Sequence, residues 1–311
     1  MAKILITESV HPIGPELLTA AGHTVVYADR DMDVIRREIV DADAVLVRII
    51  ELPGSLLATA KNLKIVSKHG VGYDNIDLDY CKSHGIAVTI TPNANSLSVA
   101  EHAFTLMLTL AKNIIPVSNE YRTVGFAAKN HAPGIEMTGK TLGLIGMGRI
   151  GKHILHMCRD GLDMHVIVYD PYISEVPEGV EKVDDLSELL RRADVVTRHC
   201  LLTDETRKLI DRERLALMKP TALLINCARG PIVDEAALIE ALENGRLAGA
   251  GLDVTDPEPV APDSPLFKLP NVIVTPHYAP TTVESATRVS KIAAENINAV
   301  LAGQEPVGRI V

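Results

Sequence analysis

The sequence predicts an α/β protein made of two successive units, each with a mostly parallel sheet. Short β-branched runs alternate with longer helical patterns along the chain, which is the rhythm of βαβ units. The length of 311 residues fits about two domains. Hydrophobic residues make up 47% and aromatic residues only 3% of the chain, with no tryptophan. We therefore expect two cores built from aliphatic side chains.

The first predicted unit contains five apolar runs of strand length, at residues 3–7, 24–29, 44–49, 63–68 and 86–91. Helical patterns separate the first three of these runs. Residues 98–114 then predict one long apolar helix, which Ser98 would cap and in which Glu101 would complete a capping box. A polar stretch, which we expect to be irregular, follows at 115–139.

The alternation restarts after residue 139 and predicts a second unit. Its apolar runs are TLGLIGMG, HVIVYD, VVTRHC, ALLINC, AGAGLDV and VIVTP. A second helical pattern at 283–303 closes the chain. The sequence therefore predicts parallel strands that are joined by helices in both units.

Composition and charge exclude several classes of function. The formal net charge of −9 argues against a general nucleic-acid-binding surface, which would be basic. The four cysteines are too widely spaced for a disulfide framework or a metal site, and they favour a reducing compartment. The N-terminus does not resemble a signal peptide, and no apolar run reaches the ~20 residues of a membrane span. We expect a cytoplasmic protein without a nucleic-acid, membrane or metal partner.

A glycine-rich turn follows the run TLGLI and precedes a helical pattern. Gly146, Gly148 and Gly151 form the spacing GxGxxG. The first glycine permits a tight turn, the second lets the backbone approach a pyrophosphate, and the third lets helix and strand pack closely. The amides of Arg149 and Ile150 would then face the phosphates at the positive end of the helix. The motif alone is weak, but its position between strand and helix favours a dinucleotide site.

An aspartate ends the next strand. Asp170 lies 19 residues beyond Gly151, where a carboxylate can accept hydrogen bonds from the adenosine ribose hydroxyls. Its charge would repel a 2′-phosphate. The pattern therefore predicts NAD rather than NADP as the cofactor.

Polar side chains follow three later strands: Arg229, the pair Asp253 and Glu258, and His277. A guanidinium can hold a carboxylate bidentately, and a histidine oriented by a carboxylate can exchange a proton with a carbonyl oxygen. Taken singly, each is more often an ordinary loop residue. In this order, beyond the ends of strands that follow a dinucleotide turn, they predict a site for hydride transfer to a ketone.

Seven segments resemble the D-isomer-specific 2-hydroxyacid dehydrogenase family in the order expected for it. They are SKHGVGYDNIDL, TPNANSLSVAEHAFTLMLTLAKNI, LGLIGMGRIGKHI, YDP, MKPTALLINCARGPIVDEAALIEAL, GAGLDVTDPEP and VTPH. The resemblance covers nearly the whole chain. It implies two Rossmann-like or flavodoxin-like parallel-sheet domains, with an NAD domain (97–281) inserted into a discontinuous substrate domain (1–96 plus 282–311). It also implies an active site in the cleft between them, and a homodimer to which 115–139 contributes.

The resemblance assigns roles to individual residues. His277 would exchange the proton, Glu258 would orient it, Arg229 would hold the substrate, and Asp253 would face the nicotinamide amide. Further cofactor contacts would come from Cys200, Thr206, Cys227 and Ala228. Substrate contacts would come from Lys68 and from the backbone amides of His69, Gly70, Val71 and Gly72.

The chain departs from the family pattern at three places. Lys68 stands where the family often has arginine, and Leu201 stands where it usually has proline. The third is the loop Tyr278-Ala279-Pro280. The motifs look most like those of phosphoglycerate dehydrogenases and hydroxypyruvate or glyoxylate reductases. A phosphate on the substrate would need cations, for which Lys68, His69 and Arg48 are candidates. An NAD(H)-sensing corepressor of the same fold is the alternative from another class, and formate or phosphite oxidation is a third.

Overall fold

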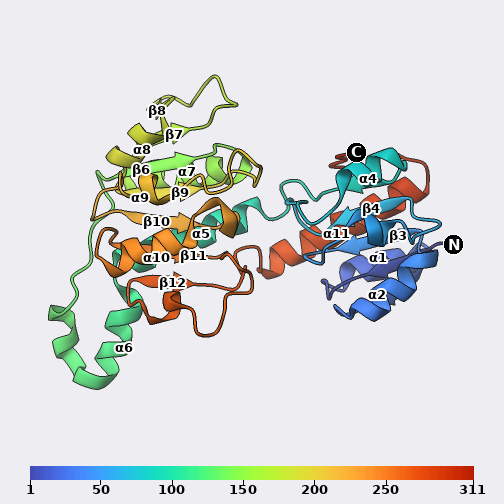
Figure 1. Ribbon diagram of the computed structural model, residues 1–311, viewed down its shortest axis with the longest axis horizontal. Coiled ribbons are helices and arrows are strands. Elements are labelled where there is room, and N and C mark those ends of the chain that lie inside the picture. Colours follow the sequence, from blue (N-terminus) through green and yellow to red (C-terminus); the bar gives the residue numbers. More distant parts are fainter. The chain divides into compact units, whose positions relative to one another are not determined.

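The computed structural model describes residues 1–311, which fold into two compact units (Figure 1). Both ends of the chain form the first unit, residues 1–95 and 280–311, and the middle of the chain forms the second, residues 96–279. None of the helices combines the length and the apolar character that crossing a membrane requires.

The first unit is built on a five-stranded parallel sheet of order β2-β1-β3-β4-β5. Its strands are β1 (Lys3–Ile6), β2 (Thr24–Tyr27), β3 (Ala44–Val47), β4 (Ile65–Lys68) and β5 (Ala87–Thr89). This is the flavodoxin-like strand order of doubly wound sheets. The β3 and β4 side chains are buried on both faces, which explains why they form continuous apolar runs in the sequence.

Helices cover both faces of this sheet. They are α1 (Ile13–Ala20), α2 (Met32–Glu38), α3 (Gly54–Leu57), α4 (Leu78–Ser83) and α11 (Val283–Leu301), with a 3₁₀ turn η1 (Ile39–Asp41). The C-terminal helix α11 packs closely on α1, since a Cβ at Gly14 would lie 2.4 Å from Oγ of Ser290. The predicted C-terminal helix is therefore confirmed, and it joins the first unit.

The second unit is built on a seven-stranded sheet of order β12-β11-β10-β9-β6-β7-β8, again with all neighbours parallel. Its strands are β6 (Thr141–Ile145), β7 (His165–Tyr169), β8 (Val180–Lys182), β9 (Val195–Arg198), β10 (Leu223–Asn226), β11 (Gly249–Leu252) and β12 (Val272–Val274). Counted from β6, the order 3-2-1-4-5-6 is that of a Rossmann fold, with β12 added at one edge. The short edge strand β8 is absent from the sequence-based prediction.

Apart from α6 (Ile114–Val124), the helices of the second unit lie in two layers on the faces of its sheet. These helices are α5 (Ser96–Ala111), α7 (Arg149–Leu162), α8 (Leu186–Arg192), α9 (Arg212–Leu215) and α10 (Glu235–Glu243), with 3₁₀ turns η2 (Gly125–Asn130), η3 (Gly230–Ile232) and η4 (Pro265–Lys268). One aliphatic core joins α5 and α7 to the sheet, and a second core joins α8, α9 and α10 to its other face.

Three predictions about α5 and the segment after it are wrong. The helix begins at Ser96, so Ser98 is a buried helical residue and forms no capping box with Glu101. It ends at Ala111, because Asn113 adopts a left-handed conformation with φ of 50°. The segment 115–139, predicted to be irregular, contains most of helix α6 and the 3₁₀ turn η2.

Candidate active site

The structure brings the predicted polar and glycine residues of the second unit to one edge of its sheet. Because all seven strands are parallel, their carboxyl ends lie along the same edge. The residues that follow these ends are Gly146 after β6, Asp170 after β7, Cys200 after β9, Cys227 to Arg229 after β10, Asp253 after β11 and His277 after β12. The candidate site is therefore an edge of one sheet, assembled from six loops.

The glycine-rich turn has the geometry that each glycine predicts. Gly146 has φ of +87°, and a Cβ there would approach the backbone of His199 and Cys200 to 3.1 Å. A Cβ at Gly151 would lie 2.3 Å from the oxygen of Gly146, so only glycine lets the helix pack this closely on the turn. At Gly148 nothing lies within 4 Å of a Cβ, and the backbone there is open to a ligand.

Helix α7 begins directly at this open position. Gly148 is its N-cap, and no side chain caps the first turn. The first backbone bond of the helix runs from Lys152 N to Gly148 O, which leaves the N–H groups of Arg149 and Ile150 without a backbone acceptor. Free amides at the positive end of a 14-residue helix form a site for phosphate groups.

Asp170 connects the turn to the next strand. Its Oδ2 accepts the N–H of Met147 at 2.9 Å, and its Oδ1 accepts the N–H of Tyr172 at 3.0 Å. The carboxylate therefore stiffens the turn and stays partly exposed at the sheet edge. The open glycine, the free helix amides and an acid at the end of β7 together fit a nicotinamide adenine dinucleotide.

His277 and Glu258 form a close pair. Nδ1 of His277 lies 2.7 Å from Oε1 of Glu258, and both side chains are about one-third exposed, at 32% and 38%. A carboxylate can only accept, so Nδ1 carries the proton in this bond. The Nε2 atom has no partner within the protein and can exchange a proton with a bound molecule.

Asp253 holds the loop that carries His277. Its backbone oxygen accepts the N–H of His277 at 2.8 Å. Its carboxylate accepts the N–H groups of Tyr278 at 2.7 Å and Ala279 at 2.9 Å, and the hydroxyl of Thr275 at 2.6 Å. Asp253 is only 1% exposed, so these donors compensate a charge that has lost its contact with water.

The sequence analysis did not identify His102, which completes this network from α5. Its Nε2 lies 3.0 Å from Oγ1 of Thr275 and 3.4 Å from Oδ1 of Asp253. Burial tends to raise the pKa of Asp253, but the hydrogen bonds from His102, Thr275 and the two loop amides outweigh it and hold this pKa below its usual value. A polar residue in an apolar helix was the only local signal for His102.

Arg229 lies in the loop after β10, and two side chains donate hydrogen bonds to its carbonyl oxygen. Its Nη1 donates to the oxygen of Ala228 at 2.8 Å, and its own carbonyl accepts from Nδ2 of Asn226 at 3.2 Å and from the guanidinium of Arg198. A Cβ at Gly230 would lie 1.9 Å from the oxygen of Thr255, so the loop after β10 packs directly on the loop after β11.

The remaining predicted cofactor residues lie on the same edge. Burial raises the pKa of the Cys200 and Cys227 thiols, which therefore remain protonated and apolar at neutral pH. All four cysteines of the chain are free thiols. Thr206 folds its own loop, since its Oγ1 donates to the oxygen of Leu201 at 2.6 Å. The amide of Ala228 donates to Oδ1 of Asn226 at 3.1 Å.

The predicted substrate loop lies after β4 in the first unit. Lys68 is 6% exposed, and its ammonium donates to Oδ1 of Asn75 at 2.5 Å and to the oxygen of Arg48. The amide of His69 donates to Val47 O, and that of Gly70 to Lys68 O. The amides of Val71 and Gly72 have no acceptor within the protein, so they are the two that remain for an anion.

A buried carboxylate that the sequence analysis did not identify supports the neighbouring loop. Glu8 is 2% exposed and follows β1. Its two oxygens accept the N–H groups of Arg48 at 2.7 Å, Ile49 at 2.8 Å and Ile50 at 3.2 Å. Glu8 therefore fixes the loop from which the Arg48 side chain extends.

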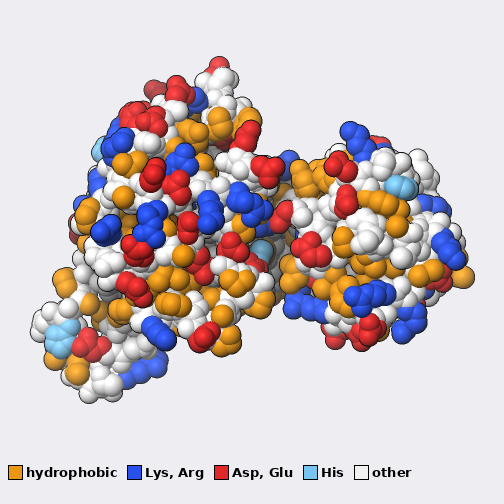
Figure 2. Space-filling model, in the orientation of Figure 1, with side chains coloured by type: hydrophobic (Ala, Val, Ile, Leu, Met, Phe, Trp, Pro, Cys, Tyr) orange, Lys and Arg blue, Asp and Glu red, His pale blue; other side chains and the backbone are white.

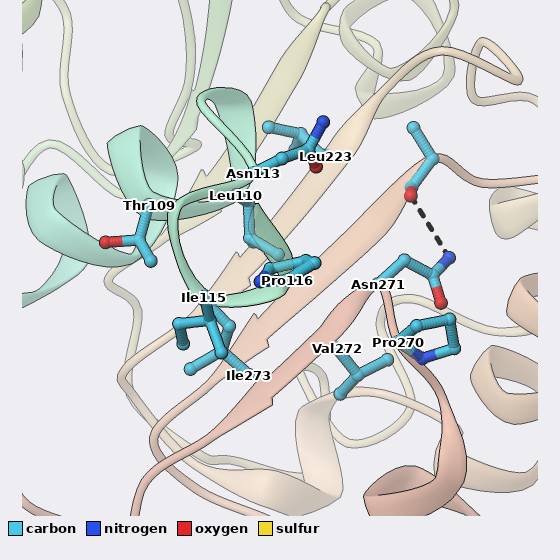
Figure 3. Close-up of a pocket in the computed structure, with 11 residues that line it drawn as sticks. Thr109, Leu110, Asn113, Ile115, Pro116, Leu223, Pro270, Asn271, Val272 and Ile273 are labelled. Atoms are coloured by element: carbon cyan, nitrogen blue, oxygen red, sulfur yellow. Dashed lines mark hydrogen bonds between the residues drawn. The ribbon is translucent and has the colours of Figure 1, made fainter. Parts of the chain in front are cut away.

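A separate pocket lies at the opposite edge of the second sheet (Figure 3). It is lined by residues at the amino ends of β10 and β12 and at the end of α5. Asn271 lies just before β12, and its Nδ2 donates to the oxygen of Ala248 at 3.1 Å. Its volume of about 50 Å³ is far below the ~300 Å³ or more of ligand pockets. Ligands of open α/β sheets bind at the carboxyl edge, so this pocket is not the dinucleotide site.

Relatives of known name match this chain in sequence along almost its whole length. The chain is 42% identical over 308 residues to D-3-phosphoglycerate dehydrogenase of Methanocaldococcus jannaschii, a match that covers 98% of this chain and 58% of that protein. It is 38% identical over 319 residues to glyoxylate reductase of Thermofilum pendens, covering 98% and 93%. The chain thus spans little more than half the length of the phosphoglycerate dehydrogenases it matches.

A solved structure and a family model agree with these relatives. D-lactate dehydrogenase from Aquifex aeolicus, complexed with NAD and lactic acid, superposes with a TM-score of 0.87 at 33% identity, covering 96% of each chain. Residues 104–279 match the model of the D-isomer specific 2-hydroxyacid dehydrogenase, NAD binding domain. The chain therefore belongs to the D-isomer specific 2-hydroxyacid dehydrogenase family, and its second unit carries the nicotinamide dinucleotide site of that family.

Proposed function

We propose that this protein is an NAD-dependent oxidoreductase that interconverts a D-2-hydroxy acid and the corresponding 2-keto acid. The observation that carries the proposal is the 2.7 Å pair of His277 and Glu258 on the same sheet edge as the glycine-rich turn. The relatives described above are named as enzymes, which favours this activity over the corepressor-like alternative.

His277 is the proton donor and acceptor in this proposal. A bound nicotinamide would supply or accept the hydride. With Nδ1 held by Glu258, Nε2 of His277 is directed to the substrate oxygen, which it protonates during reduction and deprotonates during oxidation. Glu258 stabilises the charged ring and fixes its orientation.

Arg229 holds the substrate carboxylate in this proposal. The guanidinium offers a planar pair of donors, which suits a carboxylate and polarises the adjacent carbonyl. In the first unit, the amides of Val71 and Gly72 have no acceptor within the protein and can bind an anion. We accordingly assign substrate binding to residues 1–95 with 280–311, and cofactor binding to 96–279.

Asp253 and Asp170 have different tasks toward the cofactor. Only one donor within the protein, the N–H of Ala279, reaches Oδ2 of Asp253, so this oxygen can accept one more hydrogen bond, such as that of the nicotinamide amide. Asp170 would accept from the adenosine ribose hydroxyls and would repel a 2′-phosphate, which supports NAD over NADP. Cys200, Thr206, Cys227 and Ala228 line the cofactor.

The cations near the substrate loop favour a 2-keto acid without phosphate. The ammonium of Lys68 is engaged by Asn75 and by the Arg48 carbonyl. Burial, reinforced by Arg48 and Lys68, lowers the pKa of His69 to about 3, so this ring is neutral at physiological pH. Arg48 alone of the three candidates remains for a phosphate, and its Nη1 already donates to the oxygen of Ser9.

A screen of 2-keto acids with NADH tests the activity. Glyoxylate, hydroxypyruvate, pyruvate and 3-phosphohydroxypyruvate would be compared by the loss of NADH absorbance. We expect the unphosphorylated acids to turn over faster. His277→Ala should lower turnover by about 10²–10⁴-fold and leave NADH binding intact, because it removes proton transfer alone. His165→Ala, an exposed ring at the start of β7, is the matched control.

Absence of turnover with every acid, despite tight NADH binding, would reject the dehydrogenase and favour the corepressor-like alternative. Faster turnover of the phosphorylated acid would reject only the substrate assignment.

We also propose a homodimer formed through α6 and η2. No residue of α6 is buried, and five large apolar side chains of this segment are 45–73% exposed: Ile114, Ile115, Tyr121, Val124 and Phe126. Figure 1 shows α6 projecting from its unit, and Figure 2 shows apolar side chains at its surface. Such a patch is typical of an interface.

We propose a cytoplasmic location as well, which the free thiols support.

A further inference from the structure

Arg198 ends the strand at which the second sheet changes direction. It is the last residue of β9 and pairs with Ile145, the last residue of β6, and with Asn226 on the other side. The chain builds the sheet outward from β6 through β7 and β8, and then returns to add β9 to β12 on the other side of β6. Arg198 therefore lies at the switch point, where doubly wound sheets bind dinucleotides.

The charge of Arg198 is buried and unbalanced. The residue is 0% exposed, and one nitrogen, Nη2, donates to the oxygen of Arg229. Its Nε and Nη1 are buried without a hydrogen-bond partner of good geometry. The Cys200 thiol lies beside the guanidinium, but burial raises the pKa of this thiol and keeps it uncharged at neutral pH, so no anion balances Arg198. Burial lowers the pKa of Arg198 to about 10, which keeps the guanidinium charged at neutral pH. An unpaired buried cation is costly, and native proteins rarely retain one without a reason.

The segment after Arg198 touches the glycine-rich turn. A Cβ at Gly146 would approach the carbonyl of His199 and the amide of Cys200 to 3.1 Å, so no water layer separates strand β9 from the turn. The free amides of α7 begin three residues further on. A charge enclosed by protein acts over several ångströms, because the low local dielectric screens it weakly.

We propose that Arg198 is the buried counter-charge of the cofactor's pyrophosphate, which it attracts through the protein without touching it. The pyrophosphate would bring two negative charges to the sheet edge at which Arg198 ends β9, and the cofactor-free protein supplies no anion for this cation. The inference rests on the dinucleotide binding described above. The competing explanation is structural, namely that Arg198 serves only to hold the Arg229 carbonyl.

Two substitutions separate the charge from the hydrogen bond. Arg198→Gln keeps an N–H donor for the Arg229 carbonyl and removes the charge, whereas Arg198→Lys keeps the charge. Arg191→Gln makes the same chemical change at an exposed position of α8 and serves as the control. Binding of NADH, ADP-ribose and adenosine to the cofactor-free protein would be measured by calorimetry, together with thermal unfolding.

We expect Arg198→Gln to weaken NADH and ADP-ribose by about tenfold and to leave adenosine unchanged, because only the first two carry the pyrophosphate. Arg198→Lys and Arg191→Gln should bind all three like the wild type. The cofactor-free Arg198→Gln protein should melt no lower than the wild type, since it has lost an unpaired buried charge.

Three results would overturn the inference: unchanged ADP-ribose affinity, an equal loss for adenosine, or failure of Arg198→Gln to fold. The first shows that the charge is not needed, and the other two show that the residue is structural. Failure of the wild type itself to bind NADH would reject the proposed function instead.

Discussion

The backbone N–H of His277 donates to the backbone oxygen of Asp253 at 2.8 Å, and the next two amides donate to the carboxylate of the same aspartate. His277 has φ of 52°, in the left-handed region that residues other than glycine seldom adopt. Such a conformation persists only where the surroundings hold it. Asp253 therefore keeps His277 in the orientation that meets Glu258.

Asp253→Asn should disrupt this loop. The amide group replaces one acceptor by a donor that faces the N–H of Tyr278 or Ala279, and a buried N–H is left unpaired. We expect a loss of about 1–3 kcal/mol in the free energy of unfolding. Turnover should fall by at least tenfold, with a smaller change in NADH affinity. Asp256→Asn, an exposed change three residues further on, is the control. Full activity of Asp253→Asn would show that the loop does not depend on this carboxylate.

Glu258→Gln should lower turnover without changing the geometry. Glutamine keeps an oxygen acceptor for Nδ1 of His277 but removes the negative charge beside the ring that exchanges the proton. We expect kcat for reduction of the keto acid to fall at least tenfold, while NADH affinity stays near the wild-type value. The measurement is kcat together with NADH binding, with Asp263→Asn in the same loop as the control. If kcat of Glu258→Gln equals that of the control, the carboxylate does not act on the histidine.

Asp170→Asn should weaken the discrimination against NADP(H). Asparagine keeps one oxygen acceptor for the turn and removes the charge that would repel a 2′-phosphate. The ratio of kcat/KM for NADPH to that for NADH should rise about tenfold, and kcat at saturating cofactor should stay near the wild-type value. An unaltered ratio would mean that the preference, where present, arises from another residue.

The strands and the glycine turn could be predicted because they depend on local sequence. Parallel strands buried on both faces, such as 44–47 and 195–198, form continuous apolar runs, and polar residues placed after them reach the same sheet edge. The start of α5 could not be predicted in this way, because Asn95, Ser96 and Ser98 are all good caps and packing selects among them.

Contacts between residues far apart in the chain also could not be predicted from local sequence. The contact of Glu258 with His277 joins residues 19 apart, and that of Arg198 with Arg229 joins residues 31 apart. Helix α6 did not stand out because its apolar side chains face solvent rather than a core of its own unit. The sequence does show a charged residue, Arg198, within the apolar run VVTRHC. Its position at the switch point of the sheet follows only from the strand order, which local sequence does not give.

His69 should make the fold sensitive to mild acid. Its pKa is lowered from 6.5 to about 3 by burial and by the nearby charges of Arg48 and Lys68. Between these two values the unfolded chain binds a proton that the folded protein excludes, so stability falls as the pH falls. His69→Gln removes this pH-dependent loss of stability. Relative to the wild type, the variant should gain about 2 kcal/mol in the free energy of unfolding between pH 7 and pH 5.

Urea unfolding at several pH values measures this difference. His84→Gln, an exposed histidine of the same unit, is the control and should follow the wild type. His199 adds a parallel acid sensitivity in the second unit, because burial and Arg198 lower its pKa to about 3 as well. A constant difference between wild type and His69→Gln from pH 7 to pH 5 would show that the ring takes up a proton as readily in the folded protein as in the unfolded chain.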